Sequence, residues 1–270
     1  SADTVRHVHL KSPVLSQRKL RQLLAMPPYD ASHRYLELGF DPASGMRAAI
    51  EALCAQAEAA AREGVLLLIL SDRRPRRGEL MLHALLATGA VHQHLVRAGL
   101  RCAVNLIVET GTARDAHHIA CLVGYGATAV YPYLAYQTLH DLGLRGILKT
   151  KHGEVTQIGR SYRRGVKKGL LKIISKMGIS TIGSYRGARL FEIIGLDREV
   201  TELCFAGTPS RIGGAGFAEL QAEAQHLADV GWDNNALPEI GGLLQFTPDG
   251  EYHQYNPEVV QSLQRAVASG

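Results

Sequence analysis

Short apolar runs alternate with helically periodic segments through the first half of the chain. The clearest run, Val65–Leu70, has six consecutive apolar residues between a glycine and a polar turn, which is typical of a strand buried on both faces. Further strands are predicted at His33–Leu38, Val104–Val108 and Ala127–Tyr131, and helices at Met46–Arg62, Leu80–Arg97 and Gly111–Val123. This order predicts an α/β fold in which a parallel sheet is flanked by helices.

The segments outside this core also carry helix and turn signals. Residues 1–30 predict a helical lead-in whose helix, Gln17–Leu24, is capped by Ser16 and stopped by two prolines. Residues 217–270 predict a helical appendage with helices at Ala218–Val230 and Glu258–Ala268. Between these ends we predict a helix at Lys167–Met177, a strand at Ile179–Ser184, a helix at Ala188–Ile194 and a glycine-rich turn at Cys204–Gly216.

A basic stretch interrupts the pattern. Residues 140–165 show little apolar periodicity, and we predict an irregular basic excursion there. From Arg145 to Lys176 there are ten Lys or Arg residues but a single acidic one, Glu154. Such a run is either a solvated basic face or a surface that docks on an acidic partner or anion, and both interpretations stay open. Because aromatic residues are nearly absent from this run, nucleic-acid binding is the least favoured.

Composition and cysteine spacing narrow the class of protein. The 270 residues are 46% hydrophobic with a formal charge of +5, which allows a sizeable core and only moderately favours acidic partners. The four cysteines lie far apart without metal or redox spacing, as in reduced cytosolic proteins. No apolar run approaches the length of a membrane span and no signal-peptide core is present. We therefore expect a cytoplasmic protein that binds neither nucleic acid nor membrane.

Polar residues follow the predicted strands at their carboxyl ends, where α/β proteins usually build sites. Ser71, Asp72 and Arg73 follow one strand, and Glu109 and Thr110 follow the next. The turn after Glu109, with Arg114, is either an anion cradle at a helix start or a tight turn whose threonine caps the helix. His117 and His118 lack the partners of a metal site, so we predict one inward and one outward histidine.

Eight phrases, in one order, resemble the central domain of the glutamate synthase large subunit. They are SPVLS (12–16), LSDR (70–73), GAVHQHLVRAGLR (89–101), VETGTARDAHHIACLVGYGATAVYPYLAY (from 108), KKGLLKIISKMGIST (167–181), SYRGARLFE (184–192), FAGTPSRIGG (205–214) and GEYHQYNPE (250–258). The resemblance covers nearly the whole chain. It implies that residues 1–270 form a single central domain with a degenerate (β/α) barrel-like fold, related to the FMN barrel family.

The resemblance also implies a function. In this family, a glutaminase domain and an FMN and iron–sulfur synthase domain together convert L-glutamine, 2-oxoglutarate and reductant into two L-glutamate. The central domain is expected to connect them and to help form the ammonia channel. The glutaminase nucleophile and the clustered cysteines are absent here. We therefore expect no catalytic residue, cofactor or metal in this chain. The expected partners are those two domains and, through the parent enzyme, an electron-transfer subunit or ferredoxin.

Nine residues are our candidates for channel walls or interdomain contacts. Those at strand ends are Ser71, Asp72, Arg73, Glu109 and Tyr133, and those further along the chain are Lys172, Lys176, Tyr185 and Arg186. Ordinary surface or loop chemistry explains each of them equally well. A different class of function also stays open, in which the chain is an autonomous barrel-like enzyme or small-molecule binder and the strand-end residues hold an anion.

Overall fold

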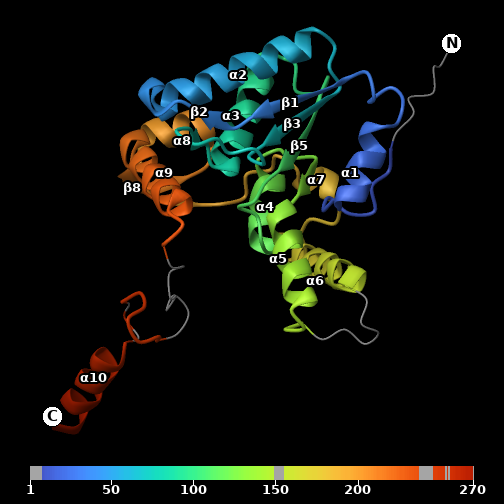
Figure 1. Ribbon diagram of the computed structural model, residues 1–270. Helices are drawn as coiled ribbons and strands as arrows, with labels where there is room; N and C mark the ends of the chain where they lie inside the picture. Colours follow the sequence, from blue (N-terminus) through green and yellow to red (C-terminus); the bar gives the residue numbers. More distant parts are fainter. Residues whose placement is uncertain (1–7, 149–154, 237–245, 253, 255, 270) are drawn as a thin grey trace. The chain divides into compact units, whose positions relative to one another are not determined.

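The computed structural model describes residues 8–148, 155–236, 246–252, 254 and 256–269, the side chains of 155 and 156 excepted (Figure 1). The chain divides into two compact units, Ser1–His226 and Leu227–Gly270. The first unit holds the sheet and its helices, and the second holds the end of α9 (Phe217–Trp232) and α10 (Pro257–Ser269). No helix among the described residues combines the length and apolar character needed to cross a membrane.

Four parallel strands form the central sheet. They are β1 (His33–Glu37), β3 (Leu67–Ser71), β5 (Asn105–Glu109) and β6 (Ala129–Tyr131), and each lies beside its predecessor in the order β1-β3-β5-β6. The crossovers contain α2 (Met46–Arg62), α3 (Ala84–Arg97) and α4 (Ala116–Gly124). This confirms the predicted parallel sheet flanked by helices. Consecutive parallel order is that of a (β/α) barrel, although the described strands form an open sheet.

The two faces of the sheet are buried by different parts of the chain. Because side chains alternate along a strand, Leu68 and Leu70 of β3 face away from Leu67 and Ile69. Right-handed crossovers place α2, α3 and α4 over the first face. The other face packs against Leu20 and Leu23 of α1 (Gln17–Leu24). Burial on both faces explains why this strand is a continuous apolar run.

The amino-terminal lead-in is held against the sheet by backbone hydrogen bonds. Leu15 N donates to Val130 O at 2.8 Å, and Val130 N donates to Pro13 O at 2.8 Å. This isolated bridge extends the sheet beyond β6. The predicted helix Gln17–Leu24 is confirmed, and the Ser16 hydroxyl caps it by accepting from Lys19 N at 3.4 Å.

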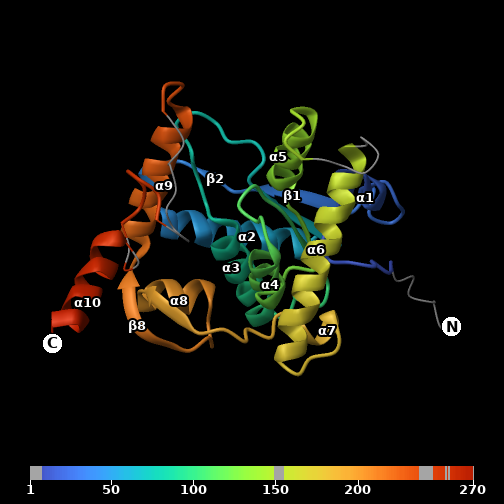
Figure 2. The same cartoon turned by 90° about the horizontal axis from the view of Figure 1, so that it is seen from below.

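The predicted basic excursion at 140–165 is wrong over the described residues. Helix α5 (Tyr133–Leu144) runs into its beginning, and α6 (Val155–Lys176) is one long helix that includes the predicted Lys167–Met177. Residues 149–154 lie outside the described part. α6 packs against α4 and α5 (Figure 2). Few residues of α6 are apolar and face the protein interior. Its outward lysines and arginines favour a helix but add no apolar periodicity to the sequence. The first part of this helix therefore could not be predicted from apolar periodicity.

Two predicted elements after α6 are also wrong. A short helix, α7 (Ile182–Tyr185), replaces the strand predicted at Ile179–Ser184, and β7 (Ile193–Leu196) lies where a helix was predicted at Ala188–Ile194. Gly187 and Arg189 both have positive φ, 72° and 55°, which breaks a helix there. β7 pairs in parallel with β8 (Ser210–Ala215), inside the predicted glycine-rich turn. Such pairing is a long-range event that local periodicity does not encode.

Two other helices begin later in the chain than predicted. Leu80 and Met81 form strand β4, which pairs with β2 (Gly39–Phe40), so α3 begins at Ala84 rather than Leu80. Likewise α4 begins at Ala116 rather than Gly111, and Asp115 caps it by accepting from His118 N at 3.0 Å. The turn η1 (Pro42–Ser44) precedes α2. The predicted helices of the carboxyl-terminal appendage are confirmed as α9 and α10.

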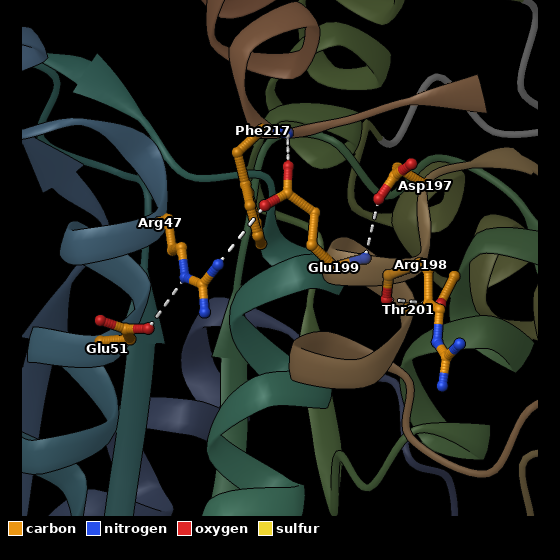
Figure 3. A network of polar contacts seen from close by, with 7 residues as sticks. All are labelled: Arg47, Glu51, Asp197, Arg198, Glu199, Thr201 and Phe217. Carbon is orange, nitrogen blue, oxygen red and sulfur yellow. Dashed lines mark hydrogen bonds and ion pairs between the residues drawn. The ribbon is translucent and has the colours of Figure 1, made fainter. Parts of the chain in front are cut away.

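A polar network joins α2 to α8 (Arg198–Cys204) and to the start of α9 (Figure 3). Glu199 accepts from Phe217 N at 3.2 Å and pairs with Arg47 at 3.4 Å. Arg47 also pairs with Glu51 at 3.1 Å. Behind this network α8 packs on α3, where a Cβ on Gly89 would come within 2.2 Å of Cys204 O. Only glycine permits that approach.

Candidate functional site

The carboxyl ends of the four strands carry a row of polar side chains. Strand register places Glu37 beside Ser71, Ser71 beside Glu109, and Glu109 beside Tyr131. Registered residues of parallel strands point to the same face, here the face that α1 covers. The end of the sheet used for sites in (β/α) folds is therefore lined by two carboxylates, a hydroxyl and a phenol.

Glu109 is the centre of this row and is 5% exposed. Ser71 Oγ donates to its Oε2 at 2.8 Å, and Arg73 Nη1 donates to its Oε1 at 3.1 Å. The Arg73 guanidinium also lies over two aromatic rings, 5.7 Å from the centre of Tyr131 and 5.2 Å from that of Tyr133. A buried carboxylate needs such partners, because an unpaired buried charge is strongly destabilising.

Asp72 joins the two loops that follow β3 and β5. Its carboxylate is 7% exposed and accepts from the Thr110 hydroxyl and from Gly111 N, the latter at 2.9 Å. The Tyr133 hydroxyl donates to Asp72 O at 3.3 Å. Burial raises the pKa of Asp72, and the hydrogen bonds from Thr110 and Gly111 offset part of that rise. Asp72 thus acts as an acceptor that fixes both loops.

Several backbone donors of the turn after Glu109 are already engaged within the protein. Gly111 N is engaged by Asp72, Thr112 N donates to Thr110 Oγ1 at 3.0 Å, and Arg114 N donates to His118 Nδ1 at 3.2 Å. These hydrogen bonds leave fewer donors for the predicted anion cradle, and the predicted threonine cap is wrong, because Asp115 caps α4. The turn is a self-paired structural element.

A cavity of about 540 Å³ opens beside this cluster. It is lined by Arg73 and Tyr131, by Tyr133, Tyr136 and His140 of α5, and by further residues of α1, α5 and α6. Burial raises the pKa of Tyr133, and it raises the pKa of Tyr136 to about 12. These phenols are therefore weak acids that stay protonated at neutral pH.

The nine predicted residues fall into two groups. Ser71, Asp72, Arg73, Glu109 and Tyr133 lie together at the strand ends, as their order in the sequence predicted. The other four lie elsewhere. Lys172 and Lys176 are exposed on α6, and Arg186 is exposed after α7. Tyr185 is fully buried and donates to Ala120 O at 3.1 Å, which leaves its side chain no surface for another domain.

Tyr131 belongs to the cluster but was missed by the sequence analysis. Its signal was available, since it ends the predicted strand Ala127–Tyr131, one strand along from Glu109. Because the rest of that strand is apolar, the sequence pattern indicates a core residue at Tyr131. It serves both purposes, because its ring belongs to the core under α1 and its hydroxyl lies 3.5 Å from Arg73 Nη1.

Residues 1–197 match the family model described as glutamate synthase central domain. The chain belongs to the glutamate synthase central domain family. It is 38% identical over 268 residues to the glutamate synthase [NADPH] large chain of Bacillus subtilis (strain 168), covering 98% of this chain and 17% of that protein. It is 39% identical to the ferredoxin-dependent glutamate synthase of Cyanidium caldarium, covering 96% of this chain and 18% of that protein. The domain thus spans less than a fifth of these relatives.

Among solved structures, a flavocytochrome b2 variant with benzoylformate has a TM-score of 0.39 at 13% sequence identity. The match covers 65% of this chain and 47% of that one. A likeness this low carries no argument about this domain. Its α/β class rests on its own sheet topology.

Proposed function

We propose that this chain is the connector domain of a glutamate synthase large chain, linking its glutaminase and synthase domains. Family membership and the small share of each relative that it covers support this proposal. The strand-end cluster supports it as well, because the Ser71 hydroxyl donates to Glu109 and the Asp72 carboxylate accepts from Thr110 and Gly111. In a catalytic centre a base or nucleophile faces the substrate, whereas here Ser71, Asp72 and Glu109 hold strand ends together.

The cavity beside the cluster is the part that we assign to ammonia passage. Ammonia must stay unprotonated and shielded from water between two active centres. A phenol with a pKa of about 12, such as Tyr136, is a weaker acid than ammonium and cannot protonate ammonia. Ionised carboxylates and an arginine guanidinium are equally poor proton donors at neutral pH. Arg73, Tyr133 and Tyr136 would therefore form walls compatible with a neutral amine, whereas His140, which also lines the cavity, is a side chain that can exchange a proton near neutral pH.

Filling the cavity in the intact large chain tests this role. Gly159 borders the cavity on α6, so Gly159→Leu should obstruct it. We expect glutaminase activity to persist while the glutamate synthesised per glutamine hydrolysed falls at least about tenfold, because ammonia escapes. Gly165→Leu is the matched control on the same helix, since a Cβ there meets nothing within 4 Å. If Gly159→Leu left both activities and their ratio unchanged, the channel assignment would be wrong.

The cofactor assignment follows from the same proposal. FMN and the iron–sulfur cluster would be bound by the neighbouring synthase domain, and a ferredoxin or an electron-transfer subunit would meet the parent enzyme rather than this domain. The names of the relatives, which specify NADPH or ferredoxin, are consistent with such a donor. An absorbance spectrum and FMN titration of the purified chain test this assignment. A yellow protein, or saturable FMN binding, would instead favour an autonomous small-molecule site at the strand ends.

A further inference from the structure

The long helix α6 carries a row of exposed cations without a carboxylate partner. A lysine or arginine recurs there at every fourth residue, and we call these five residues the basic row: Arg160, Arg164, Lys168, Lys172 and Lys176. Because residues four apart are neighbours on a helix, the row is continuous and about 24 Å long. No ion pair joins any of the five to an acidic residue in the described part of the chain.

Exposed arginines on other helices pair with an acid four residues away. Arg47 pairs with Glu51 on α2 at 3.1 Å, and Arg198 pairs with Glu202 on α8 at 2.6 Å. The same spacing on α6 instead brings like charges together, and each such pair opposes helix formation. The basic row would therefore be stabilised by an acidic partner.

An apolar pocket of about 200 Å³ lies where α6 meets the amino-terminal segment and α7. Most of its lining residues are apolar, among them Val8, Leu10, Leu170, Leu171 and Ile182. Lys11 and Lys167 line it as well. Since an apolar cavity of about 150 Å³ can bind benzene, this pocket has room for one large apolar side chain.

Leu171 connects this pocket to the basic row. Its side chain is 45% exposed, and it also lines a more open recess together with Lys172 of the row and Ile179. Figure 2 shows α7 beside this end of α6. A segment that inserts an apolar side chain next to Leu171 therefore has its flanking residues close to the cations of the row.

The burial of α6 argues against a lipid bilayer as the partner. A helix that lies on a membrane inserts its own apolar face. On α6 the apolar residues Val166, Leu170 and Ile174 pack into the protein and are at most 5% exposed. What remains accessible is a row of cations and a pocket for a single side chain, which match a protein segment.

We propose that the basic row and the apolar pocket dock an acidic amphipathic helix of a protein partner. Carboxylates at every fourth residue of that helix would face the basic row, and one leucine or phenylalanine would enter the pocket. Charge complementarity then selects the partner, and the buried apolar side chain adds affinity. The pocket lies toward the carboxyl end of α6, whereas the cavity assigned to ammonia touches α6 at Ile158 and Gly159. The proposal is therefore independent of the ammonia assignment.

A designed peptide tests this surface on the full chain. The probe is an alanine-based helical peptide of about 18 residues, long enough to span the row, with glutamate at every fourth position and one leucine beside the glutamates. Fluorescence anisotropy at low salt should show saturable binding with a Kd of about 10 μM. Lys168→Gln combined with Lys172→Gln should weaken binding about tenfold, because two charge contacts are lost.

Lys19→Gln combined with Arg21→Gln is the matched control, since it removes two exposed cations of α1 that lie outside the row. This control should leave the Kd within about twofold of the wild-type value. Leu171→Gln tests the apolar contact, and it should weaken binding of the leucine peptide but not of the same peptide with alanine at that position.

Four results would each overturn the proposal. They are the absence of saturable binding, an equal loss in the two double variants, equal binding of a peptide with the same composition in scrambled order, and tighter binding of phosphatidylserine vesicles or single-stranded DNA than of the peptide. The last result would identify the basic row as a lipid or nucleic-acid surface, because such binding needs only positive charge.

Discussion

The arginines at the two ends of the sheet have different kinds of hydrogen-bond partner. At the carboxyl end Arg73 is paired with Glu109 at 3.1 Å, and Asp72 accepts from a hydroxyl and a backbone amide. At the amino end Arg101 donates only to neutral acceptors, beside a histidine whose pKa is lowered. The carboxyl end is complete within this chain. The amino end instead satisfies its arginine with neutral acceptors, and no carboxylate partner of Arg101 lies among the described residues.

Of the changes considered, removal of Glu109 should lower stability the most. If it did not, the contrast between the two ends of the sheet would be wrong. Glu109→Ala leaves Arg73 without its counter-charge and Ser71 without its acceptor. We expect the free energy of unfolding to fall by about 3 kcal/mol in urea denaturation. Glu37→Ala is the control in the same row, since Glu37 meets exposed Arg74 only at 3.9 Å. That variant should lose less than about 0.5 kcal/mol. Equal losses would mean that the row is not self-paired.

Acidification should separate the two ends by the sign of its effect. His92 has a pKa of about 4 in the folded protein against an unfolded value of 6.5, so the unfolded chain binds the proton first. His92 should therefore lower stability as the pH falls from about 6.5 to 4, by about 2 kcal/mol after allowance for partial exposure. Asp72, whose pKa is raised in the folded protein, favours folding as it takes up its proton.

The His92 contribution is isolated by His92→Gln, whose amide oxygen can still accept from Arg101. Unfolding free energies of both proteins, measured from pH 7 to pH 4, should diverge below about pH 6.5, with the wild type losing more stability. Parallel profiles would show that His92 titrates normally. In that case burial and the contact with Arg101 would not keep the His92 imidazole neutral.

Two buried tyrosines give the smallest test of whether pairing is complete. No hydrogen bond of normal geometry reaches the buried Tyr136 hydroxyl from the described residues, although Arg163 is near enough for its charge and a weak hydrogen bond to lower the pKa of Tyr136. Tyr185 donates to Ala120 O at 3.1 Å. Tyr136→Phe should therefore raise the free energy of unfolding by up to about 1 kcal/mol, and Tyr185→Phe should lower it by about 1 kcal/mol. A loss in Tyr136→Phe would indicate a partner, such as water, that completes the carboxyl end.

The parallel sheet and its strand-end residues could be predicted because their signals are local. A buried strand such as Leu67–Ser71 must be apolar throughout, and Asp72 and Arg73 follow it directly in the chain. Parallel strands then bring their carboxyl ends to one edge, which predicts that Asp72 and Glu109 meet. The phrases shared with the glutamate synthase central domain supplied the family.

Tertiary structure alone decided the elements whose signal is not local. β7 and β8 exist because they pair with each other across the intervening helix, and α6 is a helix whose outward residues carry charge rather than periodicity. The amino-end cluster is the clearest case. His92, Arg101 and Arg186 lie on three separate segments, and each is an ordinary residue in the sequence. The electrostatic effect of the arginines on His92 arises only when folding brings the segments together, because electrostatic interactions depend on distance and burial rather than on position in the chain.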